Sequence, residues 1–198
     1  SLSRSYAAFR DRLIELDVPW ALLQATRLGK EIVQRSAAIE DKILSGNIDE
    51  ALSLGFALIE QKPPQSMLER TTETILNVAR AAYPRNREGA STLIRQATRL
   101  ALGENDVAPA SLGQVLLDAG NLSHEFGDWL LAAELLSASI GRFSSTFGDE
   151  HPATLGANSR LADTLRAQGD LAGARVLEEA VLDARRRVRY DRYDRYAA

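Results

Sequence analysis

One spacing of small and apolar residues recurs along the chain about every 40 residues, and it restricts the possible folds more than any other feature. When Gly46, Gly127 and Gly169 are aligned, an alanine follows five residues later in each copy, and a leucine follows three residues after it. A fourth copy begins near Arg85. The aligned residues are Ala51, Ala90, Ala132 and Ala174, then Leu54, Leu93, Leu135 and Leu177. A period of this length predicts stacked units, each of which buries too little apolar surface to be stable alone.

We predict that each unit is a pair of helices. Apolar residues recur at steps of three and four through 128–142 and 171–187, which places them on one helix face. Runs of alternating Val, Ile and Thr, which would indicate strands, are missing from the sequence. Prolines cannot continue a helix, and Pro64, Pro109 and Pro152 follow one another at intervals of 45 and 43 residues. They therefore mark the connections between pairs.

Residues 147–188 carry the most specific motif, FGDEHPATLGANSRLADTLRAQGDLAGARVLEEAVLDARRRV. This segment resembles the 42-residue tetratricopeptide repeat of the kinesin light chain type, in its GDEHPATL loop and in both helices that follow. Residues 109–146 are similar but looser, and residues 30–102 keep only the second-helix pattern, as in GNIDEALSLGFALIEQ. Such arrays occur in bacteria and especially in actinobacteria, and the excess of arginine over lysine agrees with a GC-rich bacterial genome.

The resemblance implies an all-α fold, a right-handed α-solenoid of about four tetratricopeptide-like helix pairs preceded by N-terminal helices. We expect N-terminal packing or capping helices, then the repeat array, then a C-terminal helix extension or tail. These parts are residues 1–29, 30–188 and 189–198, and the repeats span about 30–64, 65–108, 109–151 and 152–188. Asp17 is predicted to cap a helix that has Pro19 in its first turn.

In this family the first helices of the pairs line a concave groove, where solvent-facing residues contact an extended peptide or a partner helix. The resemblance therefore implies a set of partner-binding residues. They are Asn121, His124 and Glu125 in the third repeat and Ser159, Asp163 and Arg166 in the fourth, with Leu117 in the third and Ser36 and Glu40 in the first as further candidates.

The asparagine pair with which peptide-binding members hold a ligand backbone is absent from the positions where the family has it. Those positions read Leu117-Asp118 in the third repeat and Ser159-Arg160 in the fourth. The absence of these asparagines favours binding of a folded partner through side-chain contacts, or self-association, over binding of a peptide through its backbone.

The sequence offers little material for catalysis, so we predict that the protein is not an enzyme and holds no cofactor or metal. The absence of cysteine excludes disulfides, thiolate ligands and a cysteine nucleophile. No phosphate-binding loop of the GxxxxGK[ST] kind occurs. His124 near Glu125 and Asp128 lacks a second histidine at ligand spacing. His151 precedes Pro152, and we expect it to order the loop and the next helix start.

The bulk properties predict a cytoplasmic protein whose partner is another protein or a peptide. A net charge of −3 gives no electrostatic reason to expect nucleic acid. No apolar run approaches the roughly 18 residues of a membrane-spanning helix, so no membrane contact is expected. In the segment after Asp183, arginines alternate with Tyr190, Tyr193 and Tyr196. This segment is predicted to extend the last helix and to offer a surface through which the C-terminal end forms a homodimer.

The predicted function is that of a non-catalytic interaction scaffold, which binds a partner protein or peptide on the concave face of the array. An alternative is a regulatory or sensor repeat module, cut from a larger signal-transduction ATPase or transcription regulator. Under that alternative the chain is a fragment of a longer protein.

Overall fold

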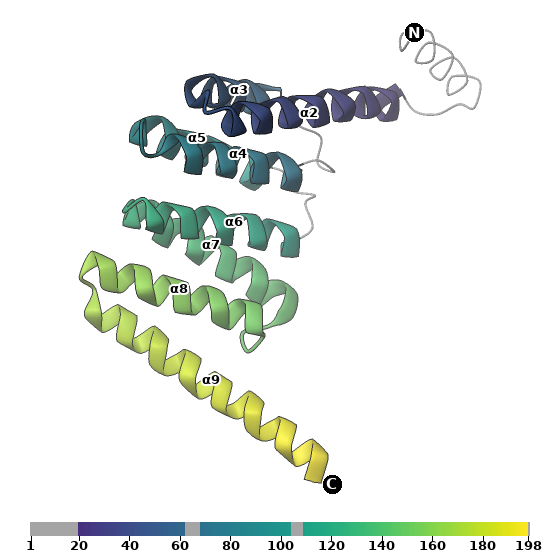
Figure 1. The fold of residues 1–198 in the computed structure, drawn as a ribbon. Coiled ribbons are helices and arrows are strands. Elements are labelled where there is room, and N and C mark those ends of the chain that lie inside the picture. The colour runs from purple at the N-terminus through teal and green to yellow at the C-terminus, as the bar shows by residue number, and fades with distance from the viewer. Residues whose placement is uncertain (1–19, 62–67, 104–108, 198) are drawn as a thin grey trace.

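The computed structural model describes residues 20–61, 68–103 and 109–197, and within these ranges it contains helices and no strand (Figure 1). The all-α prediction is therefore confirmed. The helices, in chain order, are α2 (Trp20–Leu44), α3 (Ile48–Glu60), α4 (Leu68–Ala82), α5 (Arg87–Gly103), α6 (Pro109–Glu125), α7 (Trp129–Phe147), α8 (Pro152–Gln168) and α9 (Leu171–Ala197).

These helices form four antiparallel pairs that stack in chain order, from α2/α3 at one end to α8/α9 at the other (Figure 1). The first helices of successive pairs contact one another, α2 with α4, α4 with α6, and α6 with α8. Each second helix also contacts the first helix of the next pair. The first helices thus form one continuous layer, which later positions the candidate site.

Helix α2 runs without a break across residues 29 and 30, where we placed the boundary between the N-terminal helices and the array. That division of the chain stays a prediction. The predicted cap at Asp17 lies outside the described residues.

The aligned glycines occupy the turns inside three of the four pairs. Gly46, Gly127 and Gly169 have backbone φ angles of 76°, 75° and 89°. This left-handed region is accessible to glycine without the steric cost that a Cβ atom adds. Each amide donates back to the ending helix, for example Gly169 N to Arg166 O at 3.0 Å, and the next amide to Leu165 O at 2.9 Å. These paired bonds are those of a Schellman turn, so the glycine column is a set of helix stops.

The aligned alanines all lie in the buried interior of the array. Ala51, Ala90, Ala132 and Ala174 are all buried, the first three completely. A buried position that holds only a methyl group allows the backbones of neighbouring helices to approach closely. One apolar cluster runs continuously from Ile32 on α2 to Leu135 on α7, and stacking of the pairs is what completes it.

Replacing Ala132 with leucine should lower the free energy of unfolding by about 1–3 kcal/mol, because three further carbon atoms must fit into a site with no exposed surface. Chemical denaturation would measure the change. Ala172 is exposed on α9, and the same substitution there is the control, with an expected change within about 0.5 kcal/mol. Equal effects at the two positions would contradict the close approach of the helices.

Candidate functional site

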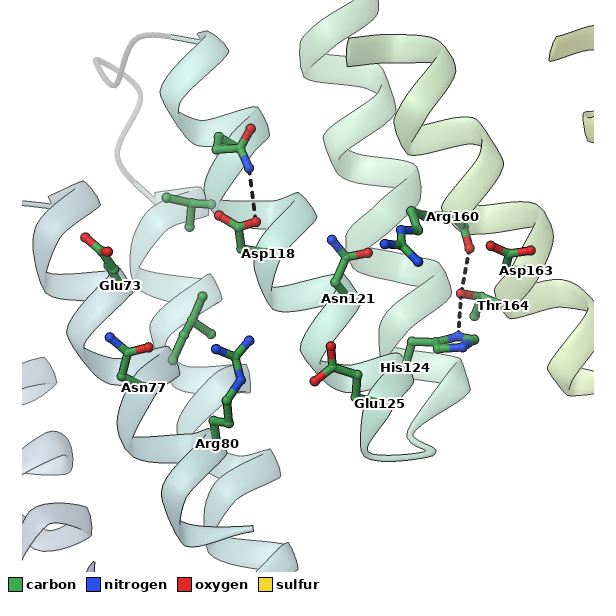
Figure 2. A pocket seen from close by; sticks show the side chains of 13 residues that line it. Glu73, Asn77, Arg80, Asp118, Asn121, His124, Glu125, Arg160, Asp163 and Thr164 are labelled. Atoms are coloured by element: carbon green, nitrogen blue, oxygen red, sulfur yellow. Dashed lines mark hydrogen bonds between the residues drawn. The ribbon is translucent and has the colours of Figure 1, made fainter. Parts of the chain in front are cut away.

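A groove of about 510 Å³ crosses the first helices of the second, third and fourth pairs. The buried side chains of Leu76 and Val115 supply its apolar part. The remaining lining residues are polar or charged, and Figure 2 shows them projecting from three parallel helices. They are Glu73, Asn77 and Arg80 on α4, then Gln114, Asp118, Asn121, His124 and Glu125 on α6, then Arg160, Asp163 and Thr164 on α8.

The helical period explains why these residues share one face. On α6, Gln114, Asp118, Asn121 and Glu125 follow one another at steps of four, three and four residues, which aligns them along one stripe. Leu116 lies between these positions in sequence and is completely buried on the other face. The polar stripe therefore lies on the face of α6 that does not pack into the core.

Four of the six predicted partner-binding residues line the groove, namely Asn121, His124, Glu125 and Asp163. The structure brings the first three together on α6 and places Asp163 opposite them on α8 (Figure 2).

Ser159 and Arg166 are not among the lining residues, because both side chains turn toward α9. The Ser159 hydroxyl accepts a hydrogen bond from Arg185 Nη2 at 3.3 Å. Arg166 forms an ion pair with Glu178 of α9. It forms another with Asp163, in which Arg166 Nη1 lies 3.1 Å from Asp163 Oδ1. Their partner-binding role stays a prediction without support from the groove.

The expectation that Ser36 faces solvent is wrong. Ser36 is completely buried, and its Oγ has no hydrogen-bond partner among the described residues. It shares a stripe with Ile32 and Ile39, which stand at i−4 and i+3 and belong to the apolar cluster. Glu40 is exposed on α2, but it does not line the groove.

Sequence reasoning missed several lining residues, and for two of them a signal existed. Asp118 and Arg160 occupy the second position of the family's asparagine pair, and both project into the groove. Glu73, Asn77 and Arg80 were missed because the second repeat matches the family too weakly in its first helix to establish the register there.

His124 links the third pair to the fourth. Its Nδ1 lies 3.1 Å from Thr164 Oγ1, across the gap between α6 and α8 (Figure 2). The Thr164 hydroxyl already donates its hydrogen to the Arg160 carbonyl oxygen at 2.9 Å, so His124 Nδ1 is the donor of the pair. In the neutral ring, Nε2 is then a hydrogen-bond acceptor.

The charges in the groove are mostly without ionic partners. Within the described residues, Arg80, Arg160, Glu73 and Glu125 form no ion pair or side-chain hydrogen bond, and Asp118 only accepts from Gln114 Nε2 at 3.0 Å. Elsewhere arginines are commonly paired, as in Arg95–Asp128 at 2.7 Å and Arg187–Glu150 at 2.8 Å. The groove thus presents charges of both signs that a ligand can neutralise.

The described side chains form no group of three His, Asp or Glu residues that could hold a metal ion. His151 acts as the N-cap of α8, where its Nδ1 accepts from Ala153 N at 3.2 Å, and its ring stacks on Phe147. The adjacent Glu150 is paired with Arg187. His151 therefore orders the start of the helix, which was its expected role.

Comparison with known proteins identifies the architecture. No family model matches the chain, and no curated protein matches it significantly. Among solved structures it is similar to the nearly identical TPR-like repeats of a Podosopora anserina protein assigned as a kinesin light chain, with 16% identity over 93% of this chain and 95% of that one, at a TM-score of 0.57. A second crystal structure of those repeats gives a TM-score of 0.56, over 94% of this chain and 96% of that one. The structure of BtubC (BKLC) from P. vanneervenii gives 0.56 at 15% identity, over 94% of this chain and 74% of that one.

The fold is a TPR-like helical repeat solenoid. At these identities the likeness shows the fold alone, and the neighbours are kinesin-light-chain-like repeat proteins. TPR-like repeats generally mediate protein interactions and are typically non-catalytic. None of the described helices combines the length and apolar character needed to cross a bilayer. The bacterial origin and the cytoplasmic location stay predictions.

Proposed function

We propose that the protein is a non-catalytic interaction scaffold, which binds a partner protein or peptide in the groove across α4, α6 and α8. The observation that carries the proposal is the lining itself, in which polar and charged side chains from three successive repeats converge on one groove. Four of its charged side chains have no ionic partner among the described residues, namely Glu73, Arg80, Glu125 and Arg160. A surface that pairs its own charges gains little from a ligand, whereas unpaired charges and amides are available to it.

The groove supports recognition of a chain segment more than chemistry on a small molecule. It is open along the layer of first helices, and its polar residues are spread over three helices instead of converging on one reacting position. Thr164 lies 3.1 Å from His124, but its hydroxyl donates to the Arg160 carbonyl oxygen and not to the imidazole, so the two are not arranged as a nucleophile and its base. The proposed role is therefore binding on the concave face of the array.

Replacing Asn121 with tryptophan should block the groove at its centre and lower the affinity for a groove ligand at least about tenfold, which is about 1.4 kcal/mol. Ligands would be selected on the wild-type protein from a random peptide library, and their dissociation constants measured for both forms. Asn121 is half-buried on the solvent side of α6, so the melting temperature should change little.

Gln96→Trp is the matched control, since Gln96 is exposed on α5 and does not line the groove. It should bind like the wild type. Selected ligands that bind all three forms equally would refute the groove as the binding site.

The regulatory alternative places the same groove in the sensor arm of a longer protein, and the features of the described residues do not favour it over the scaffold. The predicted homodimer through the C-terminal end also stays a prediction. On the described part of that end, Glu178 and Arg185 of α9 are already bound to Arg166 and Ser159 of α8.

A further inference from the structure

The groove has a defined charge layout, with acidic residues on its middle helix and one arginine on each flank. Asp118 and Glu125 stand on α6, whereas Arg80 comes from α4 and Arg160 from α8. Figure 2 shows Asn121 of the middle helix between the side chains of Arg80 and Arg160. Asp163, the acidic residue on α8, is paired with Arg166 at 3.1 Å, which it shares with Glu178. Among the described residues Arg160 forms no ion pair, so it is the unpaired charge of that flank.

On the other flank, Glu73 and Arg80 both belong to α4, but seven residues separate them. Seven residues correspond to about two turns, or roughly 10 Å along the helix axis. A ligand that crosses the helices at the level of Arg80 and Asn121 therefore lies near Arg80 and away from Glu73. Complementarity then requires an anionic group over α4, a cationic group over α6 and an anionic group over α8.

The spacing of the helices translates this layout into a sequence pattern. Packed helices lie about 8–10 Å apart between axes. A peptide in the polyproline II conformation advances about 3.1 Å per residue and repeats its direction every third residue, so side chains three apart share one face about 9 Å from each other. An advance of three residues along the peptide thus matches the distance from one helix of the groove to the next.

Resting on the proposed function, we infer that the groove recognises an extended peptide segment of the form acidic-x-x-basic-x-x-acidic. The central lysine or arginine lies between Asp118 and Glu125, and the outer carboxylates contact Arg80 and Arg160. The reversed pattern, basic-x-x-acidic-x-x-basic, would set like charges against each other at all three places. Ion pairs here form between exposed side chains, so they select between peptides more than they raise the overall affinity.

The test compares three nonapeptides with serine and proline spacers by fluorescence anisotropy at low ionic strength, where screening is weak. The first carries glutamate, lysine and glutamate at every third position, the second carries lysine, glutamate and lysine, and the third carries the residues of the first with lysine moved to one end. The first should bind at least about tenfold more tightly than either of the others. The protein's net charge of −3 would by itself favour the second peptide, so this order cannot arise from overall charge.

A charge reversal in the middle helix should remove the preference for a basic residue at the centre of the peptide. In the double variant Asp118→Lys with Glu125→Lys, the central lysine of the first peptide meets like charges while Arg80 and Arg160 still attract its outer carboxylates, so its advantage over the third peptide, which has the same net charge, should be lost. The matched control is Glu88→Lys with Glu134→Lys, which makes the same change in net charge at exposed residues of α5 and α7 and should keep the wild-type order. Should the lysine variant fail to fold, Asp118→Asn with Glu125→Gln keeps the side-chain shapes and should weaken the discrimination, because only Arg80 and Arg160 then distinguish the peptides.

Two outcomes would overturn the inference. One is equal binding of the three peptides by the wild type, and the other is the same loss of preference in the groove variant and its control. If library selection then yields peptides that Asn121→Trp excludes but that lack the pattern, the scaffold function stands and only the charge pattern fails. If no selected peptide depends on Asn121, the proposed groove function fails as well.

Discussion

Phe143→Ala is expected to lower the free energy of unfolding by about 3–5 kcal/mol. The ring of Phe143 on α7 is only 3% exposed and lies directly against the backbone of Gly113 on α6. Its removal deletes a large buried apolar surface. It also leaves a cavity between α6 and α7, because closely packed helices relax only partly around a missing side chain. Denaturant unfolding monitored by circular dichroism would measure the change.

Phe147→Ala on the same helix is the control for this substitution. Phe147 is 45% exposed and stacks on Phe143 and His151, so its loss should cost clearly less. Similar losses at the two positions would mean that the contact between α6 and α7 is not where the structure places it.

The neighbouring glycine gives a second test of the same contact. A Cβ atom at position 113 would lie 2.7 Å from the Phe143 ring, so Gly113→Ala should destabilise the wild-type protein by about 1–3 kcal/mol. In the Phe143→Ala background the clash disappears, and alanine gains up to about 1 kcal/mol over glycine in a helix. A double-mutant cycle should therefore show strong coupling between the two positions, and additive effects would contradict the contact.

Leu136→Ala is expected to cost about 2–5 kcal/mol, the second of the two largest effects. Leu136 is completely buried on α7, and its Cγ would lie 2.8 Å from a Cβ atom at Gly120 of α6. The side chain thus fills a site that glycine leaves open. The same unfolding measurement applies, with the midpoint expected to fall while the dependence on denaturant is unchanged.

The control is Leu130→Ala, six residues earlier on the same helix. Leu130 is 76% exposed, so its truncation should change the stability by no more than about 0.5 kcal/mol. A loss at Leu130 as large as that at Leu136 would show that α7 is rotated relative to the orientation described above.

The helix pairs and their turns could be predicted because their causes are local. Gly46, Gly127 and Gly169 mark turns, since the left-handed backbone that ends each helix favours glycine whatever lies around it. The alanine column could be predicted for a related reason. Each repeat needs a small side chain at the same buried position, so the alanine recurs in the sequence with the period of the repeat.

The groove was predicted less completely, since it depends on how each first helix is rotated about its axis. Successive residues of a helix differ by about 100° in direction. Ser159 and Arg160 are neighbours in sequence, yet the first turns toward Arg185 of α9 and the second lines the groove. In the second repeat the register of the first helix was open, and Glu73, Asn77 and Arg80 were missed for that reason.

Sequence alone thus predicted the repeat and the all-helical architecture, and it indicated Asn121, His124 and Glu125, which line the groove. Tertiary structure alone decided that Asp118 and Arg160 join them, that Ser159 and Arg166 bind α9 instead, and that Ser36 is buried. The physical reason is that helix-ending glycines and small buried residues are local signals that recur in the sequence of each repeat. The direction of a polar side chain depends instead on which neighbouring helices pack around its own helix.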